Sequence, residues 1–235
     1  MTNNPAQTSP RIAGLTFSTV SINGESAYVE LAADVSEPAG APPMAVEFSL
    51  ADEFNTYKAL AAVADGQAVS EMHLERASLW WPRHLGTPAL YDLAASLFAA
   101  GKLLDSHSQR VGVRRIELVR PPDPDGFQAP VISINGREMI CRWADWNPPL
   151  DTTARPTTQE YRDRIASIDA DTLRVSGGGI CEGDAFYSAC DEIGMLVWLD
   201  FVIHTAADGR TLEQCRHDAA RGPAARNHPC IAIIW

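Results

Sequence analysis

The fold of the C-terminal half is decided by the stretch LRVSGGGICEGDAFYSACDEIGMLVWLDF, residues 173–201. It predicts a strand, a glycine loop, a helix and a second strand. The apolar run at 172–175 stops at three glycines, and residues 184–193 place apolar side chains at helical spacing behind Asp184 as a candidate N-cap. The run at 195–199 is apolar on both faces, as a parallel strand covered by helices requires. The stretch therefore predicts a right-handed βαβ unit.

Alternating strands and helices extend on both sides of this unit. Asn135-Gly136 predicts a hairpin, a strand follows near 141–144, and Thr157 to Glu160 has the form of a capping box at a helix start. A weaker helix is predicted at 212–220 and a buried strand at 231–235. This order allows a doubly wound sheet or a (β/α)8 barrel, and we favour the barrel because no glycine fingerprint follows the first strand. A barrel needs roughly 250 residues, so residues 131–235 supply about its first half, four βα strands.

The N-terminal half has the pattern of an all-β domain. Alternation is clear at 29–35 and 46–50, and turn signals recur between about seven short apolar segments, which predicts an immunoglobulin-like β-sandwich. Propensity alone would also allow a helix at 59–64. The predicted organisation is a multidomain chain; its parts are a disordered tail (1–11), a sandwich (12–120), a proline-rich linker (121–130) and the half barrel (131–235).

Composition narrows the classes of partner. The formal net charge is −11 and the pI is near 4.9, with no basic cluster, which argues against nucleic acid and anionic membranes. No signal peptide or membrane-spanning run is seen, so a cytoplasmic or otherwise soluble chain is expected. The five cysteines are not spaced as metal-ligand pairs and are interpreted as thiols. No metal or cofactor is implied.

Several sequence blocks, in order, resemble glycoside hydrolase family 2 and, within it, the β-mannosidase branch. They are Trp81-Pro82 with Gly86, Pro88, Leu90 and Tyr91; Val111 to Arg114; Ile134 to Arg137; Ala144 to Trp146 with Pro148; Leu173 to Val175 with Gly177 to Gly179; Phe186-Tyr187; Cys190 to Glu192; Val197 to Phe201; and Arg226 to Pro229. The chain departs from the branch at Trp143, where Gly is usual, at Asp145 (Asn), at Ser176 (Trp) and at Leu199 (Gln). His204 to Ala207 also replaces a loop that is normally richer in aromatic and small residues.

The resemblance implies a retaining exo-glycosidase acting on terminal β-mannosides. Such enzymes use two carboxyl groups about 5–5.5 Å apart, and the resemblance implies that both follow Trp235. The chain by itself is therefore expected to be inactive, an interior piece of the enzyme. The alternatives are a non-catalytic sugar-binding or assembly protein, in which exposed barrel edges pair two copies as a homodimer, and a family 2 glycosidase for another sugar.

Five residues are expected to bind the carbohydrate. They are Asp145, Trp146, Arg174, Trp198 and Asp200, all near the carboxyl ends of predicted barrel strands. Asp145 and Asp200 would bind sugar hydroxyls, and the two tryptophans would pack against a pyranose ring. Arg174 would keep a nucleophile ionised, although an ion pair with Asp171 or Asp200 is equally compatible with the sequence, and Trp198 could be core.

Other polar candidates have plainer interpretations. Glu182 is expected to be a solvated loop residue, and His228 a hydrogen-bonded structural histidine rather than an acid–base group. Gly177 to Gly179 is expected to be a loop with positive φ and not an anion cradle. Cys190 is expected in the core.

Overall fold

The computed structural model describes residues 9–37, 40–120, 131–147, 156–176, 182–200 and 227–234. The predicted tail at 1–11 lies almost entirely outside these ranges, as do the linker at 121–130, the glycine loop at 177–179 and the helix at 212–220. The chain forms two compact units: Met1–Ala77 with Tyr91–Val111, and Ser78–Leu90 with Gly112–Trp235. Each unit is described by itself below.

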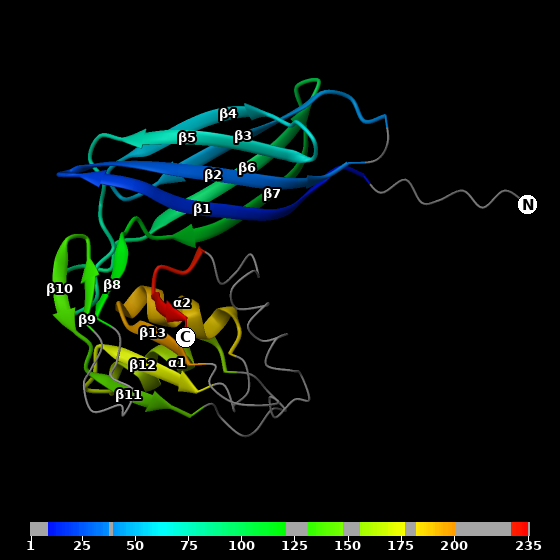
Figure 1. Cartoon of the computed structure of the whole chain (residues 1–235). Coiled ribbons are helices and arrows are strands. Elements are labelled where there is room, and N and C mark those ends of the chain that lie inside the picture. The colour runs from blue at the N-terminus through cyan, green and yellow to red at the C-terminus, as the bar shows by residue number, and fades with distance from the viewer. Residues whose placement is uncertain are drawn as a thin grey trace, which may run out of the picture. The chain divides into compact units, whose positions relative to one another are not determined.

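The first unit consists of seven strands in two antiparallel sheets (Figure 1). The strands are β1 (Arg11–Asn23), β2 (Ser26–Ser36), β3 (Met44–Ala51), β4 (Thr56–Ala62), β5 (Gln67–Leu74), β6 (Tyr91–Ala99) and β7 (Lys102–Val111). One sheet has the order β1-β2-β5 and the other β4-β3-β6-β7. The β-rich first half is thereby confirmed. The segment that propensity left open, 59–64, lies mostly in strand β4.

Strict alternation of burial explains why these segments are strands. Val29, Leu31 and Ala33 of β2 are fully buried, as are Val46, Phe48 and Leu50 of β3. Their neighbours in sequence face outward because successive side chains of a strand point to opposite faces. The turn between β4 and β5 has positive φ at both Asp65 and Gly66, 52° and 75°, as a type I′ turn requires.

The second unit contains two sheets and two helices. The antiparallel sheet β10-β9-β8 is built from β8 (Ile116–Arg120), β9 (Val131–Ile134) and β10 (Arg137–Ile140). The parallel sheet runs in chain order, β11 (Trp143–Trp146), β12 (Thr172–Ser176), β13 (Leu196–Asp200) and β14 (Ile231–Ile234). Helix α1 (Thr158–Ala166) connects β11 to β12, and α2 (Asp184–Ile193) connects β12 to β13. The predicted βαβ unit is therefore present.

Both helices begin with recognisable caps, one of them unexpected. Thr157 and Glu160 form the predicted capping box at α1. At α2 the N-cap is Gly183, with no side-chain bond, and Asp184 is the first helical residue. The prediction of Asp184 as N-cap is wrong. Its carboxylate does not cap the helix but is hydrogen-bonded to Nε2 of His228, at 3.1 Å. Gly194 ends α2 in the left-handed conformation, with φ 76°.

The segment 78–90 belongs to the second unit, although it lies between β5 and β6 in sequence. Trp80 is fully buried in that unit's core, and its indole Nε1 donates to the Asp191 carbonyl at 2.9 Å. The Arg83 guanidinium donates to the carbonyls of Ile168 and Ala170. The bounds of the two compact units therefore differ from the predicted domain ranges, 12–120 and 131–235. Residues 78–90 and 112–120 lie in the second unit and not in the first.

No helix in the described part of the chain is long and apolar enough to span a membrane.

Candidate functional site

Three of the predicted site residues lie in one row across the parallel sheet. Asp145 of β11 is in register with Arg174 of β12, and Arg174 with Trp198 of β13. Residues in register on neighbouring strands project from the same face of a sheet. Each lies within two residues of the carboxyl end of its strand. The sheet therefore brings a carboxylate, a guanidinium and an indole together at its carboxyl edge.

The opposite face of the sheet packs against the helices. Trp146, the next residue of β11, is 3% exposed, and its ring centroid lies 6.2 Å from that of Tyr161 of α1 and 5.0 Å from that of Phe186 of α2. Arg164 of α1 lies over the Trp146 ring at 4.4 Å. The structure therefore places Trp146 in the layer between sheet and helices, apart from the row of Asp145, Arg174 and Trp198.

Trp198 is held by two neighbours on the face away from the helices. The Arg174 guanidinium carbon lies 5.2 Å from the centroid of its ring, and the Trp143 ring stands perpendicular to it, at 5.7 Å and 88°. Trp198 is 4% exposed, yet its Nε1 donor has no hydrogen-bond partner in the described part of the chain. An unpaired buried donor costs about 1–3 kcal/mol. Trp143 was not among the predicted site residues.

Of the two predicted sugar-binding carboxylates, Asp145 and Asp200, the structure describes the side chain of Asp145 only. Asp145 is exposed at the end of β11. The backbone of Asp200 pairs with Ser176 in the sheet, but its side chain lies outside the described residues. Asp171, offered above as a partner for Arg174, instead accepts hydrogen bonds from the backbone N–H and side chain of Arg142, at 2.8 and 3.2 Å.

Glu182 is a packing residue that the sequence interpretation missed. It is half-buried, and its carboxylate accepts from the Trp146 indole at 2.7 Å and from the Tyr161 hydroxyl at 2.6 Å. The expectation of a solvated loop residue is wrong, since Glu182 joins strand β11 to helix α1. Only its position two residues before the start of α2 could have suggested this.

His228 is a buried structural residue, as predicted. Its Nδ1 is hydrogen-bonded to the Asp191 carboxylate and its Nε2 to that of Asp184, at 3.1 Å. Burial alone would lower the pKa of His228, but the bonds and charges of the two aspartates outweigh it and raise the pKa to about 9. The second oxygen of Asp191 accepts from the Cys230 N–H at 2.9 Å. The imidazolium therefore ties both ends of α2 to the approach of β14.

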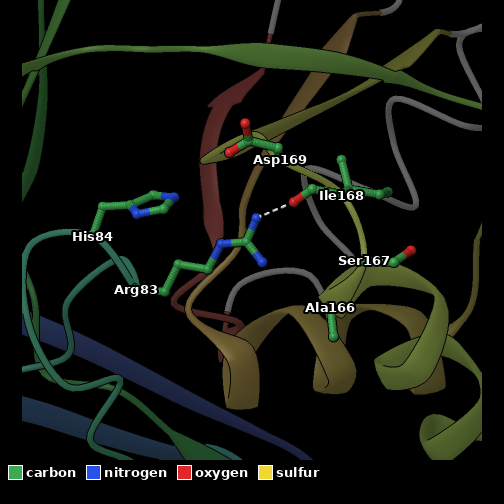
Figure 2. A pocket seen from close by; sticks show the side chains of 6 residues that line it. All are labelled: Arg83, His84, Ala166, Ser167, Ile168 and Asp169. Atoms are coloured by element: carbon green, nitrogen blue, oxygen red, sulfur yellow. Dashed lines mark hydrogen bonds between the residues drawn. The ribbon is translucent and has the colours of Figure 1, made fainter.

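A cavity of about 370 Å³ lies at the other end of the strands from the polar row. Its lining, shown in Figure 2, is Arg83, His84, Ala166, Ser167, Ile168 and Asp169. Residues 166–169 precede β12, so the cavity is at the amino end of the sheet. The Arg83 guanidinium already donates to carbonyls of this loop, to Ile168 as drawn in Figure 2 and to Ala170. We therefore take the row at the carboxyl edge as the candidate site.

The thiols in the described part of the chain are buried. Cys141, Cys190 and Cys230 are free, and burial raises the pKa of all three, to about 11 for Cys141. Cys190 is in the core, as predicted. Within the described ranges, no group of three or more His, Cys, Asp or Glu side chains is arranged to hold a metal ion.

Comparisons with known proteins agree with one another. Residues 11–114 match the family described as Glycosyl hydrolases family 2. A curated relative, β-mannosidase B of Thermothelomyces thermophilus, is 35% identical over 178 residues, which cover 72% of this chain and 21% of that protein. β-Mannosidase B of Aspergillus fumigatus is 31% identical over 187 residues, 77% of this chain and 22% of that protein. The chain thus spans about a fifth of the length of these relatives.

Solved structures show the same fold. The β-D-mannosidase of Dictyoglomus thermophilum aligns with a TM-score of 0.74 and 28% identity, over 95% of this chain and 29% of that one. A protein of Bacteroides fragilis described as a putative β-galactosidase aligns with a TM-score of 0.71 over 94% of this chain and 34% of that one; at 20% identity this is a likeness of fold alone. The family match and the similar β-mannosidases thus relate this chain to glycosyl hydrolases family 2.

Proposed function

We propose that the chain supplies part of the sugar-binding site of a retaining β-mannosidase, on strands that form the first half of a (β/α)8 barrel. The observation that carries the proposal is the row of Asp145, Arg174 and Trp198 at the carboxyl ends of three adjacent parallel strands. Active sites of (β/α)8 enzymes lie at that end of the barrel. The relatives named β-mannosidase B favour a β-mannoside as the sugar.

Each residue of the row has a chemical role in this proposal. The exposed carboxylate of Asp145 accepts hydrogen bonds from sugar hydroxyls, and the Trp198 N–H, which has no partner among the described residues, donates one. The guanidinium of Arg174 supplies a positive charge that keeps a neighbouring carboxylate ionised. Asp200, two residues beyond Trp198 on the same strand, stays in the proposed site on sequence grounds. Trp146 leaves it, because its ring packs between sheet and helices.

No catalytic carboxylate is assigned within the chain, so the proposal is tested by binding and turnover together. The purified chain is titrated calorimetrically with methyl β-D-mannopyranoside and with the galactoside. We expect binding of the mannoside, weakened about ten-fold or more by Asp145→Ala, as for loss of a hydrogen bond to a charged group. Asp169→Asn, a change of an exposed aspartate at the amino end of the sheet, is the matched control.

Three outcomes would contradict the proposal. If the chain does not bind the mannoside, the proposed row is not a sugar-binding site. If it binds the galactoside more tightly than the mannoside, its sugar specificity is that of another member of the family. Turnover of an aryl β-mannoside that is abolished by Asp200→Ala would show that the chain carries its own catalytic machinery.

A second candidate function is assembly without catalysis. In the described part of the chain, β11 pairs only with β12 and β14 only with β13, so each presents a strand edge. Unpaired edges invite pairing with another chain, and two copies could join as a homodimer. Sedimentation decides this: a compact dimer that persists on dilution supports assembly, and a monomer excludes it.

A further inference from the structure

Among the described residues of the parallel sheet, Trp143 is the one large aromatic residue that shares the face of the polar row without belonging to the row. It lies two residues before Asp145 on β11, and alternate residues of a strand share a face. It is partly buried and packs against the core of the second unit. Its nearest described aromatic partner is Trp198.

The contact between Trp143 and Trp198 spans an intervening strand. Trp143 is on β11 and Trp198 on β13, with β12 between them, so the two strands are about 10 Å apart. Their ring centroids are nevertheless 5.7 Å apart, at an interplanar angle of 88°. The two side chains therefore lean toward each other over β12, in the edge-to-face geometry that aromatic pairs prefer.

Two contacts together fix the plane of the Trp198 indole. The Arg174 guanidinium lies over its ring at 5.2 Å, a cation–π contact, and Trp143 stands perpendicular to it. A ring held by two neighbours keeps its N–H in one direction. That N–H is buried and finds no acceptor among the described residues. Its direction therefore decides whether an acceptor group of a bound ligand can form a hydrogen bond with it.

We propose that Trp143 is a positioning residue of the sugar site, which acts through Trp198: it orients the indole N–H of Trp198 so that this group donates to a hydroxyl of the bound sugar. The inference rests on the proposed function, because it needs a sugar at the carboxyl edge of the sheet. Trp143 itself touches no ligand in this arrangement, so its effect appears only through Trp198.

The test follows the Trp198 indole by NMR. The chain is labelled with ¹⁵N-tryptophan, the Trp198 cross-peak is assigned from its loss in Trp198→Phe, and methyl β-D-mannopyranoside is titrated in. We expect a downfield shift of the Trp198 N–H proton on binding. In Trp143→Leu, which keeps apolar bulk without a ring, we expect the shift to disappear and affinity to fall about five-fold, the effect of one lost neutral hydrogen bond. Trp143→Phe should restore both.

Trp146→Phe is the matched control. It changes a tryptophan of the same strand on the opposite face and removes the bond to Glu182, so it reports a general loss of packing. We expect it to leave the ligand-induced shift of Trp198 unchanged. Thermal unfolding of each variant confirms that it is folded at the temperature of the titration, and Trp143→Met, which also lacks a ring, takes the place of Trp143→Leu should that variant not fold.

The outcomes separate the two proposals. If the mannoside binds and shifts Trp198 equally in the wild type and in a folded variant that lacks a ring at position 143, Trp143 is not a positioning residue, while the proposed function stands. If Trp146→Phe abolishes the shift as Trp143→Leu does, the effect is one of general packing and the inference is overturned. If the wild-type chain binds no mannoside, the proposed function itself fails, and the inference with it.

Discussion

At the scale of single residues, Glu182 shows how one carboxylate can join elements of different type. It accepts hydrogen bonds from the indole N–H of Trp146 and from the hydroxyl of Tyr161. We expect Glu182→Gln to lower the free energy of unfolding by about 1–3 kcal/mol, because the amide offers a single acceptor oxygen and leaves one buried donor unpaired. Urea denaturation measures this. Glu138→Gln, an exposed change on β10, is the control; equal midpoints for the two variants would show that the Glu182 bonds do not stabilise the fold.

The buried imidazolium of His228 makes stability depend on pH in a defined direction. Its folded-state pKa, about 9, is above the ordinary value of 6.5. A raised pKa stabilises the fold fully below the unfolded value, and this stabilisation is lost as pH rises from about 6.5 through 9. We expect the unfolding free energy to fall by up to about 3 kcal/mol over that interval.

Urea midpoints at pH 6 and pH 9.5 test this expectation, with His228→Gln as comparison. The difference between wild type and variant should shrink toward high pH, because the wild-type imidazole is then neutral. If the urea midpoints of the wild type and of His228→Gln differ by the same amount at both pH values, the charge of His228 does not contribute to the stability of the fold.

At the scale of elements, the end of helix α2 depends on Gly194 for two separate reasons. Its φ of 76° is left-handed, and an added Cβ would lie 2.7 Å from the Arg83 backbone nitrogen. Gly136 has a φ of 82° with no heavy atom within 4 Å of the Cβ position. Substitution by Ala at either site costs about 1–2 kcal/mol of backbone strain, so Gly136→Ala measures that part alone.

We therefore expect Gly194→Ala to be clearly more destabilising than Gly136→Ala in thermal unfolding. The extra cost comes from moving the segment 78–90 away from the end of α2, since Trp81 and Pro88 also lie within 3.2 Å of the added atom. If both variants lose the same thermal stability, the segment 78–90 moves at no cost in free energy and does not stabilise the end of α2.

Local patterns of sequence predicted the elements better than the contacts between them. Alternation in β2 and β3, the capping box at Thr157 and the apolar run before Asp200 each depend on neighbours a few residues away, and each is present. The roles of Glu182, Asp184 and Trp143 depend on partners 21 to 55 residues distant, which no periodicity reveals. The row of Asp145, Arg174 and Trp198 could be anticipated because parallel strands bring their carboxyl ends together.

At the scale of the whole molecule, the second unit takes part of its core from a segment that precedes β6. Trp80 is fully buried there, and truncation of a buried tryptophan costs about 3–5 kcal/mol. We expect Trp80→Ala to remove amide-exchange protection from β11 to β13 while β1 to β7 keep theirs. Trp81→Ala, at a half-exposed neighbour, should change protection much less. Uniform loss of protection across the chain would show that the two units unfold as one.

The interleaving of the units constrains how this chain can be recombined. Residues 78–90 are flanked on both sides by strands of the first unit, β5 and β6. Any splice that keeps the seven-stranded unit whole carries Trp80 and Arg83 with it, and any splice that starts the second unit at Gly112 leaves them behind. Gene shuffling within this family should therefore yield folded chimaeras only when both units are inherited from the same parent, or from parents whose 78–90 segments are interchangeable.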